Sequence, residues 1–361
     1  MTLLEAEGLA VERAGRTVVS VDRVALDEGE TLVVLGPNGA GKSTLLLALA
    51  SLLPSRGALR WRGRPIADGL AFRRSIGVVF QRPLLLDRAV QDNAELGLAL
   101  RGVPKADRAK RAAEALSSLG VGHLASRHAR HLSGGEAQRV SIARAVACDP
   151  EILFLDEPFS ALDAPTRESL TADLAQVLRA RRAATVMVTH DRDEALSLGD
   201  KVAVLIRGEM RQLDRAEAVF AMPADPEVAA FVGVDNVLPA HVVAQTDEVT
   251  VLSVAGYTIE VTAVPPGGDD FPLLCVRPDD IVLTLEDADT GSARNVLPAT
   301  VVRVEPIGRR VRVILDAGFP LVAHVTVSSA REMRLAPGTE VTASFKATVP
   351  HLLPRHRARP L

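Results

Sequence analysis

The sequence predicts two domains of different class, an α/β domain over residues 1–232 and an all-β domain over residues 233–361. Three observations support this prediction. Up to residue 232, short and uniformly apolar runs such as "TLVVLG" and "ILFLDE" alternate with stretches of helical period, which is typical of a mostly parallel sheet buried on both faces. After "PEVAAFVGVDN" the composition shifts to Val, Thr, Pro and Gly, and the strands occur in hairpin-like pairs. A length of 361 residues also suits two domains that each bury a core.

The predicted β domain contains an internal repeat. The word "NVLPAHVV" at residues 236–243 recurs as "NVLPATVV" at residues 295–302, and a β-rich run follows each copy. The repeat predicts two related modules, at about residues 233–290 and 291–361, which together form an OB-like barrel. A chance match of a short apolar word is the alternative.

Composition narrows the class of protein. Hydrophobic residues make up 47% and charged residues 24% of the chain, and no apolar run is long enough to cross a bilayer. Neither end shows the basic-then-apolar pattern of a secretory signal, so we expect a cytoplasmic protein whose contact with any membrane would be through a partner. A net charge of −3 argues against a nucleic-acid partner. Cys148 and Cys275 lack metal-ligand spacing and are interpreted as reduced thiols.

A complete phosphate-binding loop follows the first strongly apolar strand. "GPNGAGKST" stands between "TLVVL" and a helical run, which is the setting that a P-loop requires. Its glycines allow backbone N–H groups to surround phosphates, Lys42 should contact the β- and γ-phosphates, and the Ser43 hydroxyl should bind Mg²⁺. ATP and Mg²⁺ are therefore the expected cofactors of a P-loop NTPase. The ATP-binding residues of the loop are Gly36, Pro37, Asn38, Gly39, Ala40, Gly41, Lys42, Ser43 and Thr44.

Two adjacent acids end the apolar strand "ILFLDEP". Because side chains alternate along a strand, Asp156 and Glu157 face in different directions and should have different roles. We expect Asp156 to hold Mg²⁺ through water and Glu157 to polarise the water that attacks the γ-phosphate. A helix cap or a turn is the alternative role for such acids.

A second anion-binding turn, "LSGGEAQRV", begins a helix well after the P-loop. With it, residues 1–232 resemble the ATP-binding subunits of ABC transporters. The turn itself is similar to that family's signature loop and is called the signature turn below; "SALD" is similar to the family's D-loop, Gln81 to its Q-loop glutamine and His190 to its switch histidine. The resemblance implies an ATPase coupled to transport. It further implies that Gln81 contacts the ATP site and its Mg²⁺, and that His190 is catalytic and senses the γ-phosphate.

The same resemblance implies the partners. Two ATP-binding subunits should form a head-to-tail homodimer, in which each signature turn caps the ATP held by the P-loop of the other chain. The dimer should serve integral membrane permease subunits, which dock near residues 80–90, and indirectly a solute-binding protein. The residues expected to act on ATP in trans are Ser133, Gly134, Gly135, Glu136 and Asp163.

One position departs from the family. Arg13 stands where an aromatic ring usually stacks on adenine. A guanidinium can stack on a base, so Arg13 is a candidate replacement for the ring. The alternative is an exposed arginine, with adenine held by neighbours such as Val18.

The predicted β domain resembles the TOBE/Mop domains of molybdate importers and molybdate-binding proteins, through "SARNVLPATVV", "LVAHVTVSSA" and "LAPGTEVTASFKAT". The resemblance implies an importer of molybdate or tungstate. Hydroxyl groups and fixed positive charges suit a tetrahedral dianion. The alternative is an importer of sulfate, polyamine or sugar whose β domain is a regulatory scaffold. The matching oxyanion positions are Ser292, Arg294, Thr326, Ser329 and Lys346.

Two other classes of protein compete with this interpretation. A soluble ABC protein of DNA repair or translation would have two ATPase cassettes or a coiled-coil insertion, and neither occurs in the sequence. An oxyanion sensor with a vestigial ATPase would not need the intact set of Lys42, Asp156, Glu157 and His190.

Overall fold

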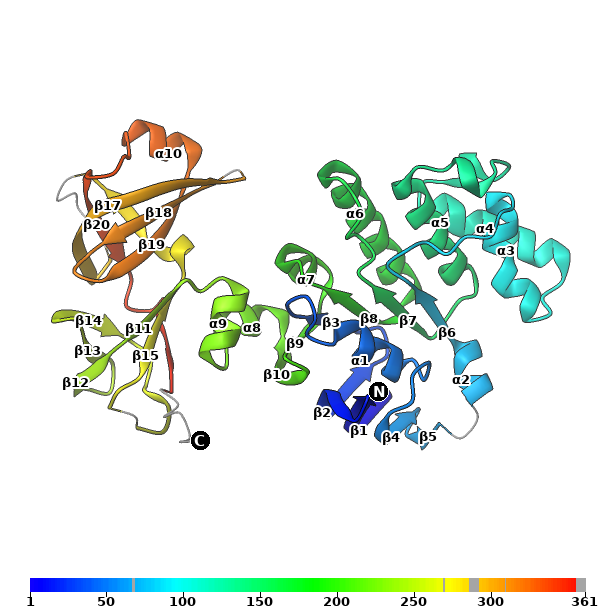
Figure 1. The fold of residues 1–361 in the computed structure, drawn as a ribbon, viewed down its shortest axis with the longest axis horizontal. Helices are drawn as coiled ribbons and strands as arrows, with labels where there is room; N and C mark the ends of the chain where they lie inside the picture. Colours follow the sequence, from blue (N-terminus) through cyan, green and yellow to red (C-terminus); the bar gives the residue numbers. More distant parts are fainter. Residues whose placement is uncertain (67–68, 269, 286–291, 309, 355–361) are drawn as a thin grey trace. The chain divides into compact units, whose positions relative to one another are not determined.

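The computed structural model describes residues 1–66, 69–268, 270–285, 292–308 and 310–354. The chain forms two compact units, Met1–Val219 and Phe220–Leu361, whose elements are labelled in Figure 1. Helix α8 (Ala216–Ala221) contains the division. Each unit has its own hydrophobic core.

Five parallel strands form the centre of the first unit. They lie side by side in the order β9-β3-β8-β7-β6. Every residue of β3, β7 and β8 is buried, so the burial on both faces that the apolar runs predict is confirmed. These strands are β3 (Thr31–Leu35), β6 (Ile76–Val79), β7 (Ile152–Asp156), β8 (Ala184–Thr189) and β9 (Lys201–Ile206).

Five further strands extend the sheet beyond β9 in the order β10-β2-β1-β4-β5. The long β1 and β2 form an antiparallel hairpin with an irregular register between Val11 and Glu12. Their buried and exposed residues are mixed, so they lack the uniform apolar runs that marked the parallel strands. These strands are β1 (Thr2–Arg13), β2 (Arg16–Asp27), β4 (Arg56–Trp61), β5 (Arg64–Pro65) and β10 (Glu209–Arg215).

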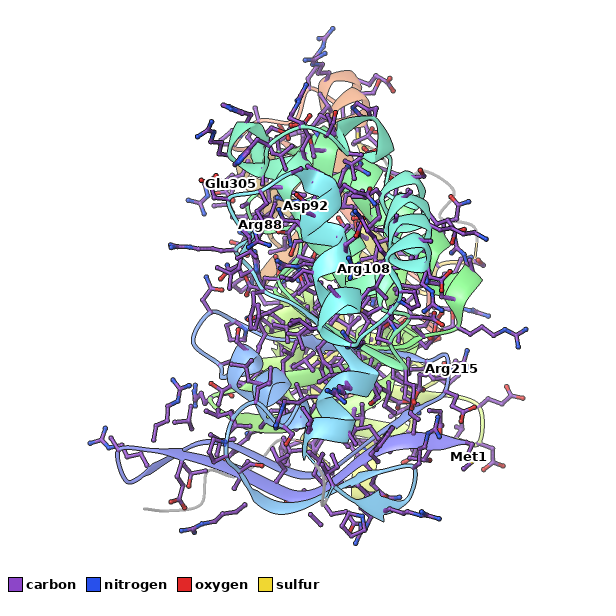
Figure 2. All side chains as sticks on the ribbon, turned by 90° about the vertical axis from the view of Figure 1, so that its right-hand side faces the viewer. Met1, Arg88, Asp92, Arg108, Arg215 and Glu305 are labelled. Atoms are coloured by element: carbon purple, nitrogen blue, oxygen red, sulfur yellow. The ribbon has the colours of Figure 1, made fainter. Side chains whose placement is uncertain are left out.

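The helices of the first unit include one that directly follows a central strand and a group that packs at the edge of the sheet. Helix α1 directly follows β3, whereas α3, α4 and α5 pack on one another beside β6, at the edge of the sheet (Figure 1). Figure 2 looks onto α3, with Arg88 and Asp92 near its first turn and Arg108 on the neighbouring α4. The helices are α1 (Lys42–Leu49), α2 (Gly69–Ser75), α3 (Val90–Leu100), α4 (Lys105–Ser118), α5 (Gly134–Ala147), α6 (Ala164–Arg181) and α7 (Arg192–Leu198).

The second unit begins with α9 (Pro226–Val232) and continues as strands. Its largest sheet has the order β16-β20-β17-β18-β19 and is strongly curled (Figure 1), and two three-stranded sheets have the orders β11-β15-β21 and β12-β13-β14. Helix α10 (Val327–Glu332) follows β19. The strands are β11 (Asn236–Pro239), β12 (His241–Gln245), β13 (Thr250–Val254), β14 (Tyr257–Val261), β15 (Leu273–Val276), β16 (Val282–Thr284), β17 (Asn295–Ile307), β18 (Arg310–Asp316), β19 (Pro320–Thr326), β20 (Glu340–Phe345) and β21 (His351–Leu353).

The two copies of the repeated word fold differently but make matching contacts. The first copy is broken into β11 and β12, whereas the second runs unbroken in β17. Asn236, which opens the first copy, accepts from the Val322 N–H (2.6 Å) and donates to its carbonyl (2.9 Å). Asn295, which opens the second, accepts from the Glu260 N–H (2.7 Å) and donates to its carbonyl (2.9 Å). Asn236 is thus bound to β19, which follows the second copy, and Asn295 to β14, which follows the first.

A hairpin turn that follows each copy repeats as well. The turns contain Gly256 and Gly318, both at positive φ, and each is followed by an aromatic residue. The two rings, Tyr257 and Phe319, meet edge to face with centroids 6.0 Å apart. A Cβ at Gly318 would lie 2.7 Å from Cε2 of Tyr257, so this contact requires glycine. The turns and the asparagines place equivalent residues of the two copies at one shared core.

Candidate functional site

The phosphate loop joins β3 to α1, as the sequence predicts. Gly39 and Gly41 have φ of 81° and 95°, and a Cβ at Gly36 would lie 2.2 Å from the Leu205 carbonyl oxygen. These positions therefore require glycine. The side chain of Lys42 is only 5% exposed, and its Nζ donates to the carbonyls of Gly36 (2.9 Å) and Pro37 (3.1 Å).

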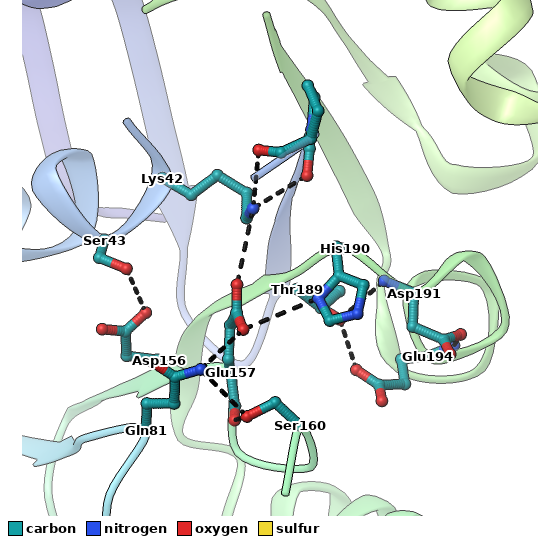
Figure 3. A network of polar contacts seen from close by, with 12 residues as sticks. Lys42, Ser43, Gln81, Asp156, Glu157, Ser160, Thr189, His190, Asp191 and Glu194 are labelled. Carbon is teal, nitrogen blue, oxygen red and sulfur yellow. Dashed lines mark hydrogen bonds and ion pairs between the residues drawn. The ribbon is translucent and has the colours of Figure 1, made fainter. Parts of the chain in front are cut away.

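Asp156 lies at the end of β7, beside the start of α1. Ser43 Oγ donates to its Oδ1 at 2.7 Å. Burial raises the pKa of the Asp156 carboxyl, while the Ser43 hydrogen bond and the Lys42 charge act in the opposite direction. A hydroxyl and a carboxylate in contact are oxygen ligands of the kind that Mg²⁺ prefers, and the Gln81 amide binds Glu157, the residue next to Asp156 (Figure 3). The donor set therefore fits the expected ion.

Glu157 is the centre of the polar network in Figure 3. Its Oε1 lies 3.6 Å from Lys42 Nζ, and its Oε2 accepts from Gln81 Nε2 at 3.1 Å and lies 3.7 Å from His190 Nδ1. Its backbone φ of 43° is in the left-handed region, and its N–H donates to the Val188 carbonyl at 3.0 Å. Neighbouring strands thus hold a strained residue where three functional groups from separate segments converge.

The signature turn forms the N-terminus of α5. Ser133 caps the helix: its Oγ accepts from the Glu136 N–H at 3.3 Å, and its own N–H donates to Glu136 Oε2 at 2.7 Å. That backbone hydrogen bond lowers the pKa of the Glu136 carboxyl. A Cβ at Gly135 would lie 2.7 Å from Thr166 Cγ2, so the glycine allows α6 to approach.

The residues expected to act in trans lie together. Ser133, Gly134, Gly135, Glu136 and Asp163 all line one cavity of about 670 Å³ between the start of α5 and the start of α6. Among the described residues, none of these five has a hydrogen bond or ion pair with Lys42, Gln81, Glu157 or His190. One chain therefore presents two separate groups of predicted site residues.

The remaining ATP-binding candidates lie in the loop itself or beside it. Ala40 is buried, Asn38 is exposed, and Thr44 lies in the first turn of α1. Arg13 lies exposed at the end of β1, beside the turn to β2. The Val18 carbonyl of β2 lies 3.2 Å from the position of a Cβ on Gly41. Both candidate neighbours of adenine, Arg13 and Val18, thus belong to the β1–β2 hairpin, which the sequence did not reveal.

The oxyanion candidates fall at two ends of the curled sheet. Arg294 precedes β17 and Lys346 follows β20, and these strands pair there through Asn295 and Phe345. Ser292 lies exposed two residues before Arg294. At the other end, Thr326 caps α10, with its Oγ1 2.8 Å from Ser329 Oγ and accepting from the Ser329 N–H. A single chain does not bring these five residues into one cluster.

Sequence reasoning missed the residues that support His190. Thr189, which precedes it, donates through Oγ1 to the buried Glu194 at 2.5 Å. Asp191, which follows it, caps α7 by accepting from the N–H groups of Asp193 and Glu194. The spacing of Asp191 and Glu194 is a helix-start signal that could have been found.

Within the described residues, no helix is long and apolar enough to cross a membrane. No group of three or more His, Cys, Asp or Glu side chains in that part of the chain could hold a metal ion.

Known proteins share both units. Residues 20–160 match the ABC transporter family, and residues 291–352 match the TOBE domain family. The chain is similar to the molybdate/tungstate import ATP-binding protein WtpC of Pyrococcus horikoshii, with 37% identity over 91% of this chain and 93% of that protein. It is similar to the spermidine/putrescine import ATP-binding protein PotA of Ruegeria pomeroyi, with 34% identity over 91% of this chain and 90% of that protein.

A third relative is the sulfate/thiosulfate import ATP-binding protein CysA of Thermosynechococcus vestitus, with 34% identity over 92% of this chain and 95% of that protein. Among solved structures, the dimeric bacterial ABC transporter cassette MJ0796 is 28% identical, with a TM-score of 0.53 over 59% of this chain and 99% of that one. The chain belongs to the ATP-binding proteins of ABC transporters, and it is a P-loop ATPase with a C-terminal TOBE domain.

Proposed function

We propose that this ATPase energises an importer of molybdate or tungstate, and that it works as a head-to-tail homodimer at the cytoplasmic face of the membrane. The observation that carries the dimer is the division of the predicted ATP-binding residues into two groups within one chain. Lys42 and Glu157 belong to one group, and Ser133 belongs to the cavity between α5 and α6. A similar bacterial cassette is dimeric. Each complete ATP site would then combine the first group of one chain with the second group of its partner.

In the proposed site, each residue has a separate task. The Lys42 ammonium would move from the loop carbonyls to the β- and γ-phosphates, and the loop N–H groups would surround them. Mg²⁺, held by Ser43, Asp156 and Gln81, would neutralise phosphate charge. Glu157 would accept a proton from the attacking water, and His190 would contact the γ-phosphate. The signature turn of the partner would add N–H donors and a helix N-terminus.

The permease would dock on the segment between Phe80 and Val90. Leu84 and Leu86 expose 60% and 41% of their surface there. Buried Asn93 holds the segment, because its Oδ1 accepts from the Leu86 N–H at 2.7 Å and its Nδ2 donates to the Leu86 carbonyl at 3.0 Å. Arg144 of α5 donates to the Leu84 carbonyl at 2.6 Å. The exposed leucines are thus tied to the helix that begins with the signature turn, which suits a coupling surface.

Similarity over nearly the whole chain to WtpC supports molybdate or tungstate as the solute. The similarity to PotA and CysA keeps polyamine and sulfate as alternatives, with sugar, in which case the TOBE domain would be a regulatory scaffold. The domain limits of 1–232 and 233–361, and the oxyanion roles of Ser292, Arg294, Thr326, Ser329 and Lys346, are part of the proposal.

Calorimetric titration of the full chain separates these solutes. We expect heat of binding from molybdate and tungstate, a weaker response from sulfate and none from spermidine, and loss of the oxyanion response in Lys346→Met. Glu340→Gln, at the start of β20, is a control that should bind normally. Binding of spermidine alone would favour the polyamine alternative. An absence of response to all four would leave the TOBE domain as a scaffold.

A further inference from the structure

The D-loop and the switch histidine are joined by one side chain, that of Arg167 in α6. Its Nη2 donates to the Leu162 carbonyl of the D-loop at 3.2 Å. Its Nη1 lies 3.5 Å from Oδ2 of Asp191, the residue that follows His190. The two nitrogens of one planar guanidinium thus reach two segments that the sequence places far apart.

From Asp191 the contacts continue to both sides of His190. The Asp191 N–H donates to Thr189 Oγ1 at 3.0 Å, and the same hydroxyl donates to Glu194 Oε2 at 2.5 Å. Figure 3 shows Thr189, Asp191 and Glu194 around the backbone that carries His190. Both neighbours of the histidine in the chain are therefore held by hydrogen bonds, so a movement of Asp191 would change the direction of the imidazole.

The contacts of Arg167 contribute little to the stability of the folded chain. Its Nε–H is buried and has no acceptor among the described residues, which costs free energy. Its side chain is 38% exposed, so the ion pair with Asp191 is partly screened and contributes little stability. Because one of its N–H groups has no acceptor and its ion pair is screened, the presence of Arg167 is better explained by the link that it makes between the D-loop and Asp191 than by a gain in stability.

We propose that Arg167 is a positioning residue that couples the D-loop to His190. When a partner chain contacts the D-loop at Asp163, the Leu162 carbonyl moves, Arg167 follows it, and Asp191 turns His190 toward its reactive position. The proposal rests on the proposed shared ATP site. Arg167 contacts no nucleotide, so its loss should slow hydrolysis without weakening the binding of ATP.

A double-mutant cycle in the full chain tests the coupling through steady-state ATP hydrolysis. Arg167→Met and Asp191→Asn should each lower kcat about tenfold with KM for ATP unchanged, and the double variant should be no slower than either one. Asp191→Asn retains the Oδ1 acceptor that caps α7. Arg179→Met, an exposed arginine further along the same helix, should leave kcat unchanged.

Arg167→Lys is the control for a loss of folding. A lysine keeps the positive charge but presents one ammonium in place of the two-pronged group, so kcat should stay within about twofold of Arg167→Met at an unchanged thermal midpoint. Full activity of Arg167→Lys, or effects of the two single variants that multiply in the double variant, would overturn the coupling. Glu157→Gln reports on the proposed function separately. If that variant is inactive while Arg167→Met is normal, the coupling alone is wrong.

Discussion

The Nζ atom of Lys42 lies 3.6 Å from Oε1 of Glu157. Both side chains are largely buried, with exposed fractions of 5% and 14%. The phosphate loop is therefore tied to the proposed general base, and the positive charge that is expected to hold ATP lies beside the carboxylate that is expected to act on water. Binding of ATP would take Lys42 from this contact and leave Glu157 with Gln81 and His190.

Removal of the Glu157 charge should stop hydrolysis while ATP still binds. Glu157→Gln keeps the shape of the side chain but cannot accept a proton, so kcat should fall by about 10²- to 10⁴-fold. Phosphate release measures the rate, and equilibrium titration with ATP measures binding. Glu168→Gln, an exposed residue of α6, should have the wild-type rate. A Glu157→Gln variant that retains more than about a tenth of the rate would show that another group is the base.

Asp156 should make stability depend on pH in a defined direction. Because burial raises the pKa of its carboxyl, the folded chain favours the protonated form. The stability that protonated Asp156 contributes is thus fully present below its unfolded pKa of 3.8, and it is lost as pH rises through the folded pKa.

Asp156→Asn should therefore stabilise the nucleotide-free chain by about 1 kcal/mol at neutral pH and by almost nothing near pH 4. The same substitution should also abolish the extra stability that the folded chain gains from ATP when Mg²⁺ is added. Thermal unfolding against pH measures both effects, with the exposed Asp22→Asn as control. A gain that grows toward acid pH would contradict this assignment.

The crosswise contacts of Asn236 and Asn295 should stabilise the TOBE-containing unit. Each side chain both accepts from and donates to the backbone of the other copy, and both residues are 2% exposed. Asn236→Ala or Asn295→Ala should lower the free energy of unfolding by about 2–3 kcal/mol, because buried backbone groups lose their partners.

Two optical signals distinguish the units. Tyr257 is the only tyrosine and Trp61 the only tryptophan, and they lie in different units. In a Trp61→Phe background, urea unfolding followed by Tyr257 fluorescence should shift to lower urea in either asparagine variant and stay unchanged in Gln245→Ala, an exposed control. An equal shift in all three would argue against a specific role for the asparagines.

Arg13 should contribute to the binding of adenine. If its guanidinium stacks on the base, Arg13→Ala should weaken ATP binding by about five- to tenfold, and Arg13→Tyr should restore it. Titration with a fluorescent ATP analogue measures the change, and Arg16→Ala, across the same turn, is the control. Unchanged affinity in Arg13→Ala would favour the alternative in which Val18 and its neighbours hold adenine.

The sequence predicts the parallel strands and the phosphate loop well because each is encoded locally. The apolar runs "TLVVLG" and "ILFLDE" became β3 and β7. The β1–β2 hairpin and its pairing with β10 depend on contacts between distant segments, which periodicity does not encode. The broken first copy of the repeat is another example, because the same word forms β11 and β12 in one place and part of β17 in the other.

The candidate site shows the same difference between features that are encoded locally and features that depend on tertiary packing. Motif order identified Lys42, Asp156, Glu157 and His190, whereas Arg167 has no motif of its own and gains its position only when α6 and α7 pack together. The sequence also could not show that the signature turn and Asp163 line one cavity, since α5 and α6 are joined there by tertiary packing.

The sharing of each ATP between two chains is tested most directly by mixed dimers. One chain carries Lys42→Ala and the other Ser133→Arg, both in a Glu157→Gln background so that ATP is trapped. In a shared site, the intact Lys42 of one chain meets the intact Ser133 of the other, so each mixed dimer should trap one ATP while each variant alone traps none. No trapped ATP in the mixture, with two per dimer in the parent Glu157→Gln protein, would contradict the shared site.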